Sequence, residues 1–347
     1  MAEQLAVTYL LEDTPLFGGV KVVLQQANLL ARRGHRVTVV GPGEPPRWFP
    51  LEAEYRRTRG LEPAEIPAAD VLVATYWTTV RRALAAVETE HEGGEVVHYC
   101  QGFEGSYTHN REDHAEIEEV YASPVPAMVV SAHLGRRLAA RFGRPSRVVP
   151  QPLESYWRPR RRWRPRRRPR VLVPGPFEID WKGVATALAA VAELRRRGRD
   201  CELVRLSQWS LGDAERAVAE PDEFHEHLDP HRVPELLRSC DLVLAASWEQ
   251  EGFGLPALEA MACGVPVVAS DVSCYRDWAM AAAALVPFDE PAAFAGVAAE
   301  VLADAGRWRR MLRSGLEVAR GYREELSATA AEAALRWVAS GAWREAP

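Results

Sequence analysis

Short apolar runs alternate with amphipathic stretches along the whole chain. Residues 22–34, for example, have their apolar positions at helical spacing. Apolar runs lie at 5–11, 36–42, 70–76, 95–101 and 126–132, and again at 170–175, 201–207, 241–247, 266–270 and 283–287. Continuous apolar strands that alternate with helices are typical of parallel sheets covered on both faces. The pattern predicts an α/β protein with two Rossmann-like domains, followed from about Ala292 by three helices and no further strand.

A basic, proline-rich stretch separates the two halves of this pattern. Residues 158–170 read RPRRRWRPRRRPR, with nine arginines, three prolines and one tryptophan. Prolines and mutually repelling charges favour an extended linker that stays out of either core. We therefore predict four parts, namely a first domain at 1–157, a linker at 158–170, a second domain at 171–325, and a C-terminal helix and tail at 326–347.

Composition limits the classes of function. The formal net charge is −5, and it would be −14 without the nine linker arginines, which disfavours general binding to nucleic acid. The five cysteines are scattered and form neither a CxxC pair nor a zinc spacing, so we expect reduced, structural thiols in a cytoplasmic protein. The sequence shows no secretion signal and no long apolar span, which predicts a soluble or peripheral protein.

The segment EGFGLPALEAMACG, residues 251–264, carries the clearest chemical signal. Its glycines allow close approach of a ligand to the backbone, and Pro256 suits the first turn of a helix whose N–H groups favour an anion such as a diphosphate. Glu251 and Glu259 flank this anion site at eight-residue spacing. Two carboxylates beside an anion fit best if each accepts hydrogen bonds from neutral hydroxyls, such as those of a sugar and a ribose.

These residues resemble the family 4 glycosyltransferases of GT-B architecture, which carry the same E-x7-E arrangement. The resemblance implies that Glu251 contacts the transferred sugar and Glu259 the nucleotide ribose. It also implies that the phosphates are bound around the loop that contains Gly252, Phe253, Gly254 and Leu255. The family's fold places two Rossmann-like domains with their parallel sheets facing each other across a cleft. The first domain would bind the acceptor, the second the nucleotide sugar, and the C-terminal helix would brace the first domain.

A second family feature is a lysine followed by glycine at the start of the second domain's first helix. Here it is Lys182, and only this residue and Lys21 are lysines among the 43 basic residues. A compact ammonium at this place can stabilise the charge of a departing diphosphate. The family usually has an arginine directly after the preceding strand, where this chain has Pro176 and Phe177. Arg205, in the next strand, is the candidate replacement.

In the first domain, Gly18 and Gly19 resemble the family's glycine pair that closes over the phosphates and the reacting centre. Gln101 and Glu104 follow a strand at the place where many family members have an active-site histidine or acid. Their Q-x-x-E pattern is similar to that of the rhamnosyltransferase-like members. Taken alone, a glycine pair before a helix is equally consistent with simple packing.

The function that the resemblance implies is that of a metal-independent, retaining glycosyltransferase of hexosyltransferase type. It would move a hexose or deoxyhexose from a nucleoside diphosphate sugar, its co-substrate, to a hydroxyl of a glycan, a lipid-linked acceptor or a small molecule. No D-x-D triplet occurs, and we expect no metal and no other cofactor. The alternatives are a catalytically degenerate GT-B binding or scaffold protein and a GT-B sugar-nucleotide epimerase.

For the linker, we expect no nucleic-acid partner, because it has a single aromatic residue and no accompanying basic face. Peripheral contact with an anionic membrane surface through Arg158 to Arg170, at the inner face, is the alternative to a plain joint.

Overall fold

The chain folds into two α/β units. In this computed structural model, unit 1 comprises Met1–Pro152 and Glu324–Pro347, and unit 2 comprises Leu153–Arg323. The structure describes residues 3–91 and 93–345. The predicted domain ranges also include residues 1, 2, 92, 346 and 347, which lie outside the described residues. The arginine-rich stretch 158–170 belongs to unit 2.

Unit 1 is built on a parallel sheet of seven strands in the order β3-β2-β1-β4-β5-β6-β7. The strands are β1 (Ala6–Leu10), β2 (Arg36–Gly41), β3 (Glu54–Arg57), β4 (Val71–Ala74), β5 (Glu95–Cys100), β6 (Ala127–Val129) and β7 (Ser146–Val148). The helices are α1 (Gly18–Arg32), α2 (Trp77–Thr89), α3 (His114–Ala122), α4 (Ala132–Phe142) and α12 (Glu324–Ala339). Strands β1 and β4, at the centre, are buried throughout, as expected of strands covered on both faces.

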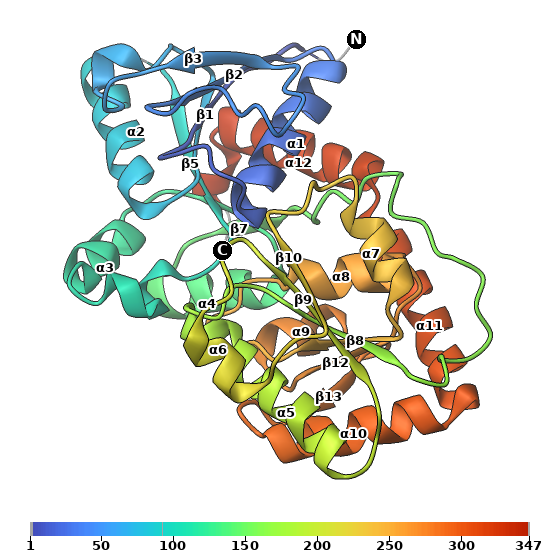
Figure 1. The fold of residues 1–347 in the computed structure, drawn as a ribbon. Coiled ribbons are helices and arrows are strands. Elements are labelled where there is room, and N and C mark those ends of the chain that lie inside the picture. The colour runs from blue at the N-terminus through green and yellow to red at the C-terminus, as the bar shows by residue number, and fades with distance from the viewer. Residues whose placement is uncertain (1–2, 92, 346–347) are drawn as a thin grey trace. The chain divides into compact units, whose positions relative to one another are not determined.

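Helix α12 lies beside α1 in unit 1 (Figure 1), although about three hundred positions separate them. Arg33, just after α1, holds α12 through two ion pairs, at 2.9 Å to Glu325 and 2.8 Å to Glu332. The end of the chain is therefore part of the first unit.

Unit 2 has a parallel sheet of six strands in the order β10-β9-β8-β11-β12-β13. The strands are β8 (Arg170–Pro174), β9 (Glu202–Ser207), β10 (Glu223–Glu226), β11 (Leu242–Ala245), β12 (Val267–Ser270) and β13 (Ala284–Val286). The helices are α5 (Val184–Arg196), α6 (Asp213–Val218), α7 (Val233–Ser239), α8 (Leu255–Ala262), α9 (Ser273–Trp278), α10 (Pro291–Ala303) and α11 (Ala305–Ala319). Helices α5 and α10 lie side by side (Figure 1). Their apolar side chains are part of the core of the unit.

Each sheet reverses its strand order once. In unit 1 the reversal lies between β1 and β4, and in unit 2 between β8 and β11. Loops that leave the two central strands at such a point diverge to opposite sides and leave room for a ligand at the carboxyl edge. These two edges are therefore where functional side chains are expected.

Two sequence expectations concern the whole chain. All five cysteines are buried and unpaired, as expected for structural thiols. Among residues 3–91 and 93–345, no helix combines the length and the apolar character needed to cross a membrane.

Candidate active site

Lys182 and Glu251 meet at the strand reversal of unit 2. Lys182 follows β8 and Glu251 follows β11, the two neighbouring central strands. The Nζ atom of Lys182 lies 2.8 Å from Oε2 of Glu251, and the hydroxyl of Ser247 donates to the same oxygen at 2.9 Å. The structure thus brings together two predicted site residues that are 69 positions apart.

The environment of Glu251 keeps it ionised. Burial by itself would raise the pKa of this carboxyl. The Lys182 ammonium opposes this effect, with the Ser247 hydroxyl and the Phe253 backbone N–H, and the net pKa lies below the ordinary value. A carboxylate held in this state is an acceptor for hydroxyl groups at neutral pH.

Gly183 lets the two loops approach each other backbone to backbone. It has φ +65, and a Cβ atom placed on it would lie 1.9 Å from the carbonyl oxygen of Ala246. The N–H of Trp248 donates to the carbonyl of Trp181 at 2.8 Å, and the Lys182 ammonium lies 4.2 Å from the centre of the Trp181 ring. The lysine-glycine pair is therefore a geometric requirement of this site.

We expect the substitution Gly183→Ala to lower the free energy of unfolding by about 2 kcal/mol, because the methyl group must displace the Ala246 backbone at a strained dihedral angle. The matched control is Gly198→Ala, which also has positive φ but has nothing within 4 Å of its Cβ position. The control should lose about 1 kcal/mol from backbone strain alone. Urea denaturation of both variants measures the difference, and equal losses would contradict the contact.

The loop before α8 is held by an aromatic cluster. The ring of Phe253 stacks on Trp278 at 4.7 Å with an interplanar angle of 3°, and the Trp278 indole N–H donates to the Phe253 carbonyl at 2.9 Å. Gly254 has φ +85, and its Cβ position is blocked by the Tyr275 ring at 2.5 Å. Gly252 and Phe253 are buried in this loop. The backbone of the predicted phosphate loop is thus fixed before any ligand binds.

Helix α8 starts at Leu255 with Pro256 in its first turn. The N–H groups of a first turn have no partner within the helix, and they point outward at the carboxyl edge of β11. Glu259 is partly exposed on this helix as its fifth residue.

The prediction that Arg205 replaces the missing phosphate-binding arginine is not supported by the structure. The Arg205 side chain is 0% exposed and pairs with Glu215 at 2.5 Å. Its guanidinium also donates to the carbonyls of Val173, and of Gly175 at 2.9 Å. Because these contacts occupy the guanidinium inside unit 2, Arg205 fixes the loop after β8 and does not reach its surface. Phe177, in the place of the usual arginine, packs against the hydrophobic core.

In unit 1, the structure brings three of the four predicted residues close to the strand reversal. Helix α1 begins at Gly18, directly after the loop from β1. The Gln101 amide donates to the carbonyl of Gly19 at 3.1 Å, and a Cβ atom on Gly19 would lie 3.3 Å from that amide nitrogen. The glycine pair therefore packs tightly against Gln101.

Glu104, the other residue predicted for the active site after β5, is buried. It is only 3% exposed, and its carboxylate accepts a hydrogen bond of 2.5 Å from the Tyr121 hydroxyl. The Nε2 atom of His98, which is also fully buried, lies 3.8 Å from Oε1 of Glu104. We reassign Glu104 to a buried polar cluster behind the carboxyl edge of β5, because its oxygens face the interior of unit 1.

Glu12 was missed by the sequence analysis. It lies in the loop after β1, with an exposed side chain that accepts a hydrogen bond from the Thr78 hydroxyl. Partial desolvation, with the nearby carboxylates of Glu104 and Asp13, raises the pKa of Glu12 to about 7. An acid two residues after the first central strand, and six positions before the glycine pair, was the available signal.

Metal ligands do not gather in the described parts of the chain. Across residues 3–91 and 93–345, no group of three or more histidine, cysteine, aspartate or glutamate side chains is placed to hold a metal ion. The candidate site consists of the ammonium, carboxylates and backbone groups described above.

Known structures share this two-sheet architecture. Sucrose-phosphate synthase from Thermosynechococcus elongatus matches 98% of this chain and 100% of its own, with a TM-score of 0.79 and 18% identity. The Anabaena HepE protein, solved in complex with UDP and glucose, matches 96% of this chain and 100% of its own, with a TM-score of 0.74 and 14% identity. The fold class is GT-B, with two Rossmann-like units, as predicted.

A family model matches most of the second half of the chain. Residues 168–304 match the family described as glycosyl transferases group 1, which agrees with the predicted resemblance for this part of the chain. A D-inositol 3-phosphate glycosyltransferase of Salinispora tropica is 36% identical over 128 residues, which are 36% of this chain and 25% of that protein. This chain and the first relatives overlap over only 25% to 42% of the relatives' own length.

Proposed function

We propose that this protein is a retaining glycosyltransferase that moves a hexose or deoxyhexose from a nucleoside diphosphate sugar to an acceptor hydroxyl. The observation that carries the proposal is the Lys182–Glu251 pair at the strand reversal of unit 2, inside the segment that matches glycosyl transferases group 1. The D-inositol 3-phosphate glycosyltransferase relative and the UDP and glucose bound by HepE are consistent with this substrate class.

Each candidate site residue of unit 2 has a chemical role in this proposal. The Lys182 ammonium and the first turn of α8 stabilise the negative charge that develops on the departing diphosphate. Glu251 accepts hydrogen bonds from hydroxyls of the transferred sugar, and Glu259 from those of the ribose. Arg205 acts only by holding the loop after β8.

The reaction exchanges one bond at the anomeric carbon. The acceptor oxygen forms a bond to this carbon on the face from which the diphosphate oxygen departs, so the configuration is retained. The acceptor hydroxyl proton passes to the departing phosphate oxygen. This route needs no protein nucleophile. Because Lys182 and backbone N–H groups stabilise the negative charge on the departing diphosphate, we propose a metal-independent reaction.

Unit 1 would supply the acceptor side. Gly18 and Gly19 begin helix α1, and Gln101, directly after β5, packs closely against this glycine pair. Glu12 adds a carboxyl whose pKa is raised to about 7. The acceptor is a glycan, a lipid-linked sugar or a small molecule with a free hydroxyl. We also propose a cytoplasmic protein with peripheral contact to an anionic membrane through Arg158–Arg170.

The test is a donor panel with the purified protein. We expect hydrolysis or transfer with one of UDP-glucose, GDP-mannose and dTDP-rhamnose. The substitution Glu251→Gln should reduce the rate by about 100-fold, because it removes the acceptor charge for sugar hydroxyls and leaves Lys182 unpaired. Glu235→Gln is the matched control and should be unchanged, because Glu235 is exposed and its side chain has no hydrogen bond or ion pair within the described residues.

The outcomes separate the alternatives. Nucleotide binding without turnover would identify a degenerate binding protein, for which the absent arginine at Pro176 and Phe177 is the supporting feature. Conversion of the donor sugar without an acceptor would identify an epimerase. Full activity of Glu251→Gln would refute the assignment of the site.

A further inference from the structure

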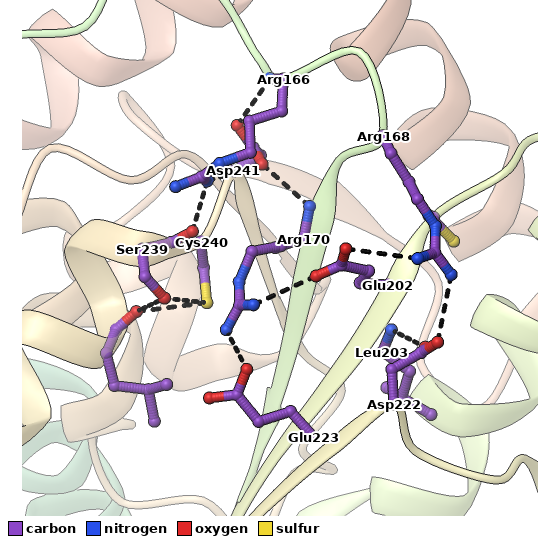
Figure 2. A network of polar contacts seen from close by, with 12 residues as sticks. Arg166, Arg168, Arg170, Glu202, Leu203, Asp222, Glu223, Ser239, Cys240 and Asp241 are labelled. Carbon is purple, nitrogen blue, oxygen red and sulfur yellow. Dashed lines mark hydrogen bonds and ion pairs between the residues drawn. The ribbon is translucent and has the colours of Figure 1, made fainter.

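A buried aspartate of unit 2 binds several residues of the arginine-rich segment. Asp241, just before β11, is 0% exposed. Its carboxylate accepts hydrogen bonds from the backbone N–H groups of Arg166 at 2.9 Å and Arg170 at 2.8 Å, and pairs with the guanidiniums of Arg162 and Arg166. Figure 2 shows the Arg166 and Arg170 contacts converging on this carboxylate. The segment is therefore held at a defined place.

Two more arginines at the end of the segment are neutralised by nearby acids. Arg170 pairs with Glu202 at 3.1 Å and with Glu223 at 2.5 Å, and Arg168 lies 3.3 Å from Glu202 and 3.1 Å from Asp222 (Figure 2). With Arg162 and Arg166, these residues form an inner set of four arginines whose charges are already compensated.

Four other arginines of the segment are uncompensated. Within the described residues, the side chains of this outer set have no hydrogen bond or ion pair and are exposed. The outer set consists of Arg160, Arg161, Arg164 and Arg167. Trp163 lies among them and is 73% exposed, more than any other large apolar side chain in the described chain. The segment thus combines a net positive charge with one amphipathic ring.

We infer that the outer arginines and Trp163 bind the surface of an anionic lipid bilayer. Guanidinium groups interact favourably with anionic headgroups, and an indole ring prefers the interface between headgroups and acyl chains. Attachment through Asp241 keeps these side chains from folding back onto local acids, because the inner set already occupies Asp222, Glu202 and Glu223. The inference extends the membrane contact of the proposed function and does not depend on sugar transfer.

The chemistry favours a bilayer over a nucleic acid. A strand of nucleic acid would run beyond this short segment onto a protein whose charge without the nine arginines is −14. Binding of single strands also relies on several aromatic rings for stacking, and the segment has one. A bilayer needs only a local cluster, since attraction decays within a Debye length of about 8 Å at physiological salt.

The experiment is sedimentation with vesicles. The protein of residues 1–347 should sediment with vesicles of equal parts phosphatidylglycerol and phosphatidylcholine, and not with phosphatidylcholine alone. Replacing Arg160, Arg161, Arg164 and Arg167 by glutamine should lower the partition coefficient by roughly fivefold for each arginine. Trp163→Ser, with all charges kept, should lower it severalfold.

The control keeps the same change of net charge. Four exposed arginines whose side chains have no hydrogen bond or ion pair in the described part of the chain are replaced by glutamine, namely Arg47, Arg111, Arg199 and Arg313. This variant should bind anionic vesicles as the parent does. Failure of the parent to sediment, equal loss in the control variant, or binding to single-stranded DNA in place of vesicles would each overturn the inference. Donor turnover is measured separately, so either proposal can fail alone.

Discussion

Replacing Lys182 with alanine is expected to reduce sugar transfer by about 100- to 1,000-fold, the range typical of a lost charge-stabilising group. Two effects add. The departing diphosphate loses its cation, and the buried carboxylate of Glu251 loses the partner that lies 2.8 Å away. The matched control is Arg199→Ala, which removes one exposed charge after α5 and should leave the rate unchanged.

The pH dependence separates these two effects. In the parent protein the pKa of Glu251 lies below its usual value, so the carboxylate is ionised throughout the neutral range. Without the ammonium, burial becomes the dominant influence and the pKa rises, which moves the acid limb of the pH–rate profile to higher pH. Lys182→Arg keeps a positive charge, so its acid limb should stay in place while the rate falls through poorer placement. An unshifted acid limb in Lys182→Ala would contradict the coupling.

The sequence predicted the central strands well because burial on both faces imposes continuous apolar runs. Strands β3, β7 and β10 escaped because they are short and lie at sheet edges, where polar residues such as those of EYRR in β3 are tolerated. The alternation of runs and helices shows which strands exist, while the order in the sheet depends on long-range pairing that no local pattern encodes.

The candidate site was predictable where residue type and topology act together. Lys182 and Glu251 each follow a central strand, so their meeting follows from the strand order of unit 2. Arg205 was misread because its exposure depends on the side of β9 that it occupies and on Glu215, ten positions later. An arginine inside an apolar strand more often needs a buried partner than a ligand.

The arginine-rich segment also depends on a long-range contact that its local sequence does not reveal. Its composition predicted an extended, solvated linker, and its backbone does stay irregular. No local signal marks Asp241, more than seventy positions away, as the residue that attaches it. Composition gives the total charge of the segment, and only the fold divides that charge into compensated and exposed parts.

Replacing Asp241 with alanine is expected to lower the free energy of unfolding by about 3 kcal/mol, because two backbone N–H groups and two guanidiniums lose a buried acceptor. The control is Asp200→Ala, an exposed acid that pairs with Arg168 at 3.0 Å and should cost less than about 0.5 kcal/mol. Urea denaturation measures both.

Limited digestion with trypsin, which cleaves after arginine, distinguishes attachment of the segment from general stability. If Asp241 holds the segment, Asp241→Ala should be cut within residues 158–170 at urea concentrations far below its unfolding transition, while the parent and Asp200→Ala are not. Detachment of this kind needs only local opening, since no helix or strand includes residues 158–169. Cleavage that follows global unfolding in all three proteins would mean that Asp241 stabilises unit 2 without positioning the arginines.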